Sequence, residues 1–159
     1  MTTSSHTSLG LNVRHWIIFA GFVIALIVLW ILVFPHAAAS ADLHVGKAVL
    51  HVELATTEAQ RELGLGNRTS LPADHGMLFV FPVEGIYPFW MKGMEFPLDI
   101  VWIDKGTVTE VETLRQPTST TAIPEEYQPK YPADRVLEIN AGEANKLGIG
   151  TGTALQLPR

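Results

Sequence analysis

The sequence predicts a mainly β fold of the α+β class: a small barrel or sandwich of about seven strands with two short helices, preceded by one transmembrane or signal helix. From residue 43 onward, short segments rich in β-branched and aromatic residues are separated by Gly and Pro, as strands and turns are. The first 41 residues differ, because Arg14 is their only charged residue apart from histidine. The chain therefore divides into an apolar N-terminal segment and one polar domain.

The N-terminal segment contains an apolar block, residues 16–34, that carries no charge. As an α-helix this block would span roughly 28 Å, which is close to the hydrocarbon thickness of a bilayer. Arg14 precedes the block and no Lys or Arg follows it before Lys47, so the positive-inside rule places residues 1–15 in the cytoplasm. We therefore expect a single-pass membrane protein that contacts the lipid bilayer through residues 16–34, with its domain in the periplasm or on the cell surface.

A cleaved signal peptide is the alternative interpretation of the same block. The linker, residues 35–42, contains Ala39 and Ala41, which match the small residues of a signal-peptidase site. Cleavage near Ala41 would release a secreted domain. The block is longer than the usual signal core of about 7–15 residues, which favours an uncleaved anchor. Under both interpretations residues 43–159 form an extracytoplasmic domain.

The strand candidates of this domain alternate in polarity or are rich in β-branched and aromatic residues. The turn Asp104-Lys105-Gly106 predicts a hairpin between residues 98–104 and 107–114. Residues 98–104 are apolar on both faces, so we expect this strand in the middle of the structure. The candidates are residues 48–54, 76–81, 87–92, 98–104, 107–114, 135–140 and 153–157.

Two short helices are expected from their capping residues. Thr57 is followed three residues later by Gln60, which is the spacing of a capping box, and Gly64 ends the helix. Asn140 stands in the same relation to Glu143. Each helix is too short to be stable alone, so packing on the domain must hold it.

Four segments of the domain carry a family resemblance. The longest, residues 89–100, reads Phe-Trp-Met-Lys, then Gly-Met-Glu-Phe, then Pro-Leu-Asp-Ile. Residues 62–68, 76–81 and 136–142 supply a Gly-Leu-x-x-Arg element, a central strand and a late strand-to-helix element. With these segments in this order, the chain resembles the family called domain of unknown function 192 over nearly all of residues 45–157.

The resemblance implies a compact, mostly β barrel or sandwich with small helices, often exported, and it implies no established reaction. Two positions depart from the family pattern. Gly66 replaces the usual methionine, and Gly93-Met94 replaces a common Asn-Thr pair. These departures concern polar contacts of the Asn-Thr pair and leave the expected fold unchanged.

We predict a ligand-binding site formed by Arg68, Trp90, Lys92, Asp99 and Glu138, beside the long loop of residues 116–134. Lys92 and Asp99 flank a Pro-containing bend, and the guanidinium of Arg68 can pair with Glu138 through a two-pronged contact. The ring of Trp90 can stack on a sugar or heterocycle, while Lys92 and Arg68 hold a small polar or anionic ligand. The alternative is that both ion pairs are structural, since such pairs are common and modest in effect.

The leading hypothesis is thus a non-enzymatic, membrane-anchored module that binds a small ligand or a partner protein of unspecified kind, without a cofactor. One alternative is an enzyme acting on cell-envelope carbohydrate, which needs two carboxylates about 5–10 Å apart; Asp99 and Glu138 are the candidates.

A second alternative is a copper-handling module. Met77, Met91, Met94 and His75 supply the soft thioether and imidazole ligands that copper(I) prefers. The simpler interpretation is that these methionines pack in the core beside aromatic residues.

Composition excludes several classes of function. The chain has no cysteine, so a disulfide scaffold, a thiol nucleophile and a cysteine zinc site are excluded. Its formal charge is −5 and its basic residues do not cluster, whereas nucleic-acid binding requires Lys and Arg that neutralise phosphates.

Overall fold

The computed structural model describes residues 10–33, 39–119 and 121–158. The chain forms two compact units, Met1–Ala37 and Ala38–Arg159. The predicted boundaries at residues 1–9 and 34–38 lie outside the described residues.

The N-terminal unit contains one helix, α1 (Gly10–Val33), which includes most of the predicted apolar block. Its described aromatic side chains are exposed, among them Trp16, Phe19 and Phe22. Within the described part of the chain, no helix combines the length and apolar content required of a membrane span. Membrane anchoring through residues 16–34 stays a prediction.

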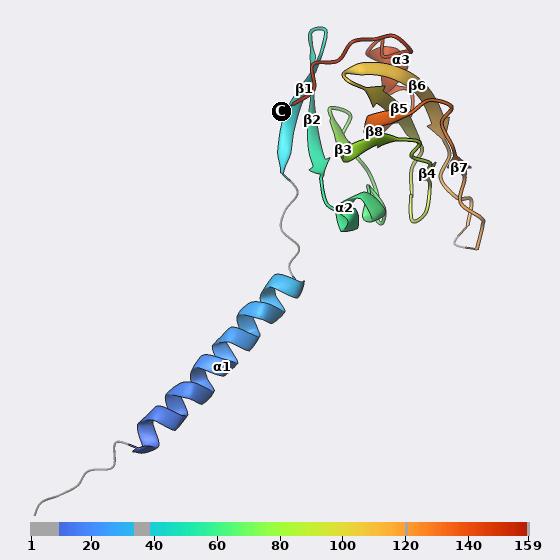
Figure 1. The fold of residues 1–159 in the computed structure, drawn as a ribbon. Coiled ribbons are helices and arrows are strands. Elements are labelled where there is room, and N and C mark those ends of the chain that lie inside the picture. The colour runs from blue at the N-terminus through green and yellow to red at the C-terminus, as the bar shows by residue number, and fades with distance from the viewer. Residues whose placement is uncertain (1–9, 34–38, 120, 159) are drawn as a thin grey trace, which may run out of the picture. The chain divides into compact units, whose positions relative to one another are not determined.

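The second unit is built on a six-stranded mixed sheet with the strand order β1-β2-β3-β8-β5-β6 (Figure 1). β2 and β3 are parallel, and every other neighbouring pair in this sheet is antiparallel. A second sheet pairs β4 with β7. The strands are β1 (Ser40–Val45), β2 (Ala48–Ala55), β3 (His75–Gly85), β4 (Phe89–Trp90), β5 (Leu98–Asp104), β6 (Thr107–Leu114), β7 (Glu126–Tyr127) and β8 (Ala133–Asn140).

The predicted hairpin is confirmed with both of its boundaries, β5 and β6. Its turn uses positive φ at Lys105 (47°) and Gly106 (83°). β5 lies between β8 and β6, and both of its faces are buried, as its two-sided apolar pattern predicts. Ile100 and Trp102 enter one core cluster, and Val101 and Ile103 enter the other, so the domain has apolar cores on both sides of its sheet.

The expectation of a barrel is wrong, because β1 and β6 are the two edges of the sheet and do not pair with each other. The segment 153–157, predicted as a strand, makes only two isolated bridges. One joins Gln156 to His44 of β1, and the other joins Ala154 to Thr107 of β6. This segment therefore contacts both edges of a mixed sheet that remains open.

The two predicted short helices are present, but their caps differ. α2 (Glu58–Leu63) has the full capping box of Thr57 and Gln60, as predicted. α3 (Glu143–Lys146) begins after Gly142, and Asn140 instead donates from Nδ2 to the Leu71 carbonyl at 2.9 Å. In the ribbon, α2 and α3 lie at opposite ends of the domain (Figure 1).

Candidate functional site: a cleft between α2 and β4

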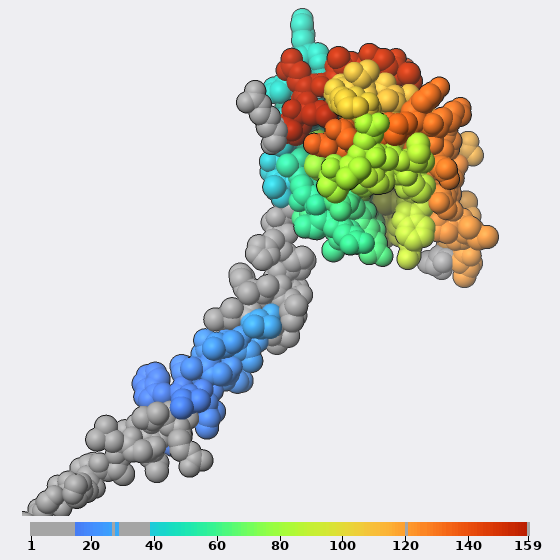
Figure 2. Space-filling view, in the orientation of Figure 1, coloured from blue at the N-terminus to red at the C-terminus, as the bar shows by residue number. Residues whose placement is uncertain are grey.

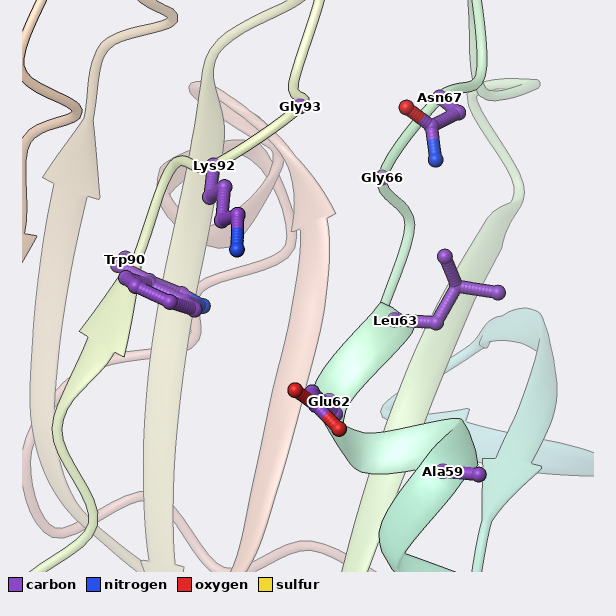
Figure 3. Close-up of a pocket in the computed structure, with 8 residues that line it drawn as sticks. All are labelled: Ala59, Glu62, Leu63, Gly66, Asn67, Trp90, Lys92 and Gly93. Carbon is purple, nitrogen blue, oxygen red and sulfur yellow. The ribbon is translucent and has the colours of Figure 1, made fainter.

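One cleft of the domain lies between α2, with the loop that follows it, and β4, with the loop that follows that strand. In the space-filling view, α2 and the β4 segment lie next to each other on one face (Figure 2). The cleft has a volume of about 340 Å³, which is within the range of small-ligand sites. It is lined by Ala59, Glu62, Leu63, Gly66, Asn67, Trp90, Lys92 and Gly93 (Figure 3).

The two loops approach each other closely because glycines stand where they meet. The Asn67 N–H donates to the Gly93 carbonyl at 2.8 Å. Gly93 has φ 72°, and a Cβ there would lie 3.2 Å from Asn67 Oδ1. A Cβ on Gly66 would lie 2.9 Å from the Leu63 carbonyl oxygen, which is closer than real Cβ contacts allow. Gly66 and Gly93, which stand at the two departures from the family pattern, therefore line this cleft.

One wall of the cleft pairs an aromatic ring with a cation. β4 directs Phe89 into the core and leaves the side of Trp90 open to solvent, so that Trp90 is 48% exposed. Lys92 Nζ lies 4.8 Å from the centroid of the Trp90 ring, which is a cation–π distance. Among the described residues, no carboxylate forms an ion pair with Lys92. Figure 3 shows Glu62 on the opposite wall.

A small recess beside the cleft contains a buried carboxyl group. The recess has a volume of about 30 Å³, and Trp90 and Lys92 line it as well as the cleft. Glu138 lines this recess and is only 5% exposed. Its Oε2 atom has no hydrogen-bond partner, which is rare for a buried polar atom.

The environment of Glu138 favours the protonated form. Burial raises its pKa to about 8, while the Leu65 backbone N–H and the Arg68 charge act in the opposite direction. Glu138 lies on β8 between Met77 of β3 and Ile100 of β5, in the middle of the sheet. A perturbed acid beside a cleft is a candidate for a functional group.

Arg68 does not pair with Glu138, contrary to the sequence-based prediction. Its guanidinium instead makes two contacts with Glu53 of β2, with Nη1–Oε1 at 2.5 Å and Nη2–Oε2 at 2.8 Å. This pairing lowers the pKa of Glu53 and raises that of Arg68. Arg68 therefore fixes the loop after α2 to the sheet, and it affects Glu138 only through its charge.

Asp99 does not pair with Lys92 either. It is 2% exposed, accepts a hydrogen bond from Thr113 Oγ1 at 2.7 Å, and accepts another from the Ala144 N–H at 2.9 Å. The second bond joins β5 to the first turn of α3. Asp99 is thus a structural residue outside the cleft.

The two carboxylates of the carbohydrate-enzyme hypothesis point to opposite faces of the sheet. Asp99 is paired with Ile139 in the register, whereas Glu138 is paired with Ile100, one position away on each strand. Because side chains alternate across a strand, Asp99 and Glu138 cannot flank one glycosidic bond. The geometry gives this hypothesis no support.

The positions of the described methionines and His75 also give the copper hypothesis no support. Met77, Met91 and Met94 are buried in one apolar cluster with Phe79, as the packing interpretation expects. His75 Nδ1 lies 2.8 Å from Asp74 Oδ1 and the ring packs against His51. Among the residues that the structure describes, no group of three or more His, Asp or Glu is arranged to hold a metal ion.

Of the five predicted site residues, the structure brings Trp90, Lys92 and Glu138 together. Sequence reasoning missed Glu62 and Asn67 as cleft residues. Both lie in the segment 62–68 that carries the family resemblance, and Asn67 has φ 64°, a conformation that Asn tolerates better than most residues. An Asn three residues after the helix-ending Gly64 was the available signal.

The domain is of the small mixed-sheet α+β class, with a ligand-sized cleft beside a buried acid. The chain belongs to the DUF192 family, described as "Uncharacterized ACR", whose sequence model matches residues 41–157. No curated protein matches the chain.

Two crystal structures share this fold. One is of a "putative transcription regulator" from Sinorhizobium meliloti 1021, with 32% identity, a TM-score of 0.65, and coverage of 77% of this chain and 97% of that chain. The other is of a protein of unknown function from Novosphingobium aromaticivorans DSM 12444, with 28% identity, a TM-score of 0.63, and coverage of 78% and 90%. Since the fold accounts for 97% of the Sinorhizobium chain, a domain of this kind folds with little else attached.

Proposed function

We propose that this protein is a non-enzymatic binding module, and that its cleft between α2 and β4 takes a small polar ligand with a flat ring. The observation that carries the proposal is the half-exposed Trp90 ring, with the Lys92 ammonium 4.8 Å from its centroid. A ring of this kind offers a stacking face, and Lys92 offers a charge that no described carboxylate neutralises.

The architecture of the cleft supports binding rather than a purely structural role for these residues. Arg68 and Asp99 are paired with protein partners, whereas Trp90 and Lys92 face the open volume. Gly66 and Gly93 add no side chains to the lining of the cleft. The cleft is therefore formed by backbone geometry that the fold holds in place, which limits the entropy cost of binding.

For the location of the domain, we propose membrane anchoring through residues 16–34, with residues 1–15 in the cytoplasm and the domain outside. The uncharged block and the position of Arg14 support this orientation. Release near Ala41 is the alternative. A reporter enzyme fused after residue 159 distinguishes the sides of the membrane: activity of an exported phosphatase is expected, and activity confined to the cytoplasm would contradict the orientation.

The charge of this domain gives no support to regulation of transcription through DNA binding. All 16 acidic residues and 10 of the 11 basic residues follow residue 41, so the domain has a net negative charge. A protein that binds DNA backbone needs the opposite balance on its contact surface.

The binding proposal is tested on the isolated domain, residues 39–159, by NMR. This domain contains two tryptophans, Trp90 in the cleft and Trp102 in the core, where Trp102 is fully buried and its Nε1 donates to the Tyr87 carbonyl at 2.9 Å. Small ring compounds that are acidic, neutral or basic are titrated at millimolar concentration. We expect at least one charge class to shift the Trp90 indole resonance and to leave that of Trp102 in place.

Two variants make this test specific. Lys92→Met removes the cleft charge, and Lys47→Met removes a matched exposed charge from the turn between β1 and β2. Loss of the Trp90 response in Lys92→Met but not in Lys47→Met supports the proposal. If no charge class moves the Trp90 resonance, the cleft does not bind small ring compounds and the proposed function is wrong.

A further inference from the structure

We propose that Glu138 is the ligand-recognising acid of the cleft: it donates a hydrogen bond from Oε2 to the carboxylate of an anionic ligand, which Lys92 holds at the same time. This inference rests on the proposed function and deepens it by naming the chemical class of the ligand, a carboxylate attached to a flat ring.

The unpartnered carboxyl oxygen of Glu138 faces a small recess. Glu138 is 5% exposed, and its Oε2 lacks a partner. A Cβ on Gly64, which has φ 54°, would lie 3.5 Å from this oxygen. Glycine at this position therefore keeps the space beside Oε2 open, where most other residues would be strained and would bring a methyl group against the carboxyl.

The recess and the cleft differ in size, and each admits a different part of a ligand. The recess holds about 30 Å³, which exceeds the roughly 10–15 Å³ that one water molecule needs, so it admits a small polar group. The cleft beside it holds about 340 Å³, which is enough for a ring. Trp90 and Lys92 line both volumes, so a ring against Trp90 brings an attached head group to Lys92 and the recess.

The charged groups around the recess favour a negative head group. Arg61 and Glu62 of α2 line it, together with Lys92 from the loop after β4. Arg68 acts on Glu138 from the loop after α2. Arg68 is paired with Glu53, so when Glu138 carries its proton the remaining charges are two cations, Arg61 and Lys92, and one anion, Glu62. This balance attracts a negative head group and repels an ammonium group.

The protonation state agrees with this geometry. Burial raises the pKa of Glu138 to about 8, so the group is mostly protonated at pH 7 and can act as a donor. A bound carboxylate stabilises the proton further, and deprotonation places two carboxylates against each other. Binding should therefore weaken as the pH rises through the pKa of Glu138.

The test uses three probes that share a phenyl ring and differ in charge: benzoate, benzyl alcohol and benzylamine. Dissociation constants are measured on residues 39–159 from the Trp90 indole shift, with Trp102 as the internal reference. At pH 6.5 we expect benzoate to bind about 10- to 100-fold more tightly than benzyl alcohol, from hydrogen bonds that involve a charged group. Benzylamine should bind most weakly of the three.

Glu138→Gln is the decisive variant, because the amide keeps the shape and a donor but cannot ionise. In the unmodified domain, the dissociation constant for benzoate should rise above pH 8, approaching about tenfold per pH unit. In Glu138→Gln it should stay within about threefold of its value at pH 6.5 at every pH tested. Lys92→Met should lose benzoate binding at every pH, and Lys47→Met should retain it.

The outcomes separate this inference from the proposed function. If benzylamine binds best, or if Glu138→Gln abolishes binding of the preferred probe, the cleft binds a ligand but Glu138 does not donate to a carboxylate, and the inference is wrong. A pH dependence that persists unchanged in Glu138→Gln also overturns it. If none of the three probes shifts the Trp90 resonance, the proposed function itself fails.

Discussion

Two buried acids on neighbouring strands, Asp99 of β5 and Glu138 of β8, have opposite surroundings. Both are nearly inaccessible, with exposed fractions of 2% and 5%. Asp99 uses both carboxylate oxygens, one toward Thr113 and one toward the Ala144 N–H. Glu138 leaves Oε2 without a partner beside an open recess. Burial alone therefore does not distinguish a structural acid from a ligand-binding acid, whereas an unused hydrogen-bonding atom does.

The two acids also lie on different faces of one sheet, and the two faces pack against different elements. The face of Asp99 packs against α3 and the C-terminal segment, and its acid joins β5 to the helix. The face of Glu138 lies under α2 and β4, where the cleft opens.

Asp99→Ala should have the largest effect on stability. It removes two hydrogen bonds to a charged acceptor and leaves the Ala144 N–H buried without a partner, so we expect a loss of about 3–5 kcal/mol in the free energy of unfolding. Urea unfolding of residues 39–159 measures this. A loss below about 1 kcal/mol would mean that Asp99 is not the structural acid of the pair.

Glu138→Gln should raise, rather than lower, the free energy of unfolding at alkaline pH. The pKa of Glu138 is about 8 in the folded protein against 4.5 for an ordinary glutamate, so between these values the folded state binds the extra proton. The free energy of unfolding of the unmodified domain should therefore fall, by a few kcal/mol in all, as the pH rises from about 5 to about 8.

The free energy of unfolding of Glu138→Gln should not show this fall with pH. The variant should therefore be the more stable protein at pH 9. Urea unfolding at several pH values compares the two proteins, and Glu110→Gln serves as a control at a buried acid that already has partners, Tyr127 and the Lys130 N–H. A Glu138→Gln protein that is less stable at every pH would show that the carboxyl group serves the fold.

Arg68→Gln should have a smaller effect, because the pair it forms with Glu53 is about one-third exposed on each side. We expect a loss of about 1 kcal/mol, at the upper end for a partly solvated pair with two contacts. The same substitution removes a charge that lowers the pKa of Glu138, so that pKa should rise further. An unchanged pKa of Glu138 would mean that Arg68 acts only on Glu53.

Lys92→Met should have the smallest effect on stability, within about 0.5 kcal/mol, because Lys92 is exposed and its described contact is with Trp90 alone. Lys92→Met should instead weaken ligand binding. A large drop in the melting temperature would identify Lys92 as a structural residue.

Local signals in the sequence predicted much of the fold. The hairpin of β5 and β6 was predicted with its boundaries because turn residues and two-sided apolarity both mark it. The capping box of α2 is equally local. The openness of the sheet was not predictable, because it depends on whether segment 153–157 continues as a strand or makes two bridges.

The site was predicted in part, for the same physical reason. Trp90 and Lys92 lie two residues apart in the chain, at the end of β4 and in the turn after it, so their proximity is local. Glu53, the partner of Arg68, lies on β2, and the partners of Asp99 lie on β6 and in α3. An Arg in a sequence does not reveal which of several carboxylates it meets. The pair of Arg68 and Glu53 joins the loop after α2 to β2, and no pattern in the sequence indicated that pairing.

The most direct measurement is a ¹³C NMR titration of the Glu138 carboxyl carbon in residues 39–159, with and without benzoate. The account predicts that this carbon titrates with a pKa near 8 in the free domain, and that benzoate moves the midpoint upward because the bound anion favours the proton. A midpoint in the ordinary range of glutamate, or a midpoint that benzoate moves downward, would contradict the claim that Glu138 is the acid that recognises the ligand.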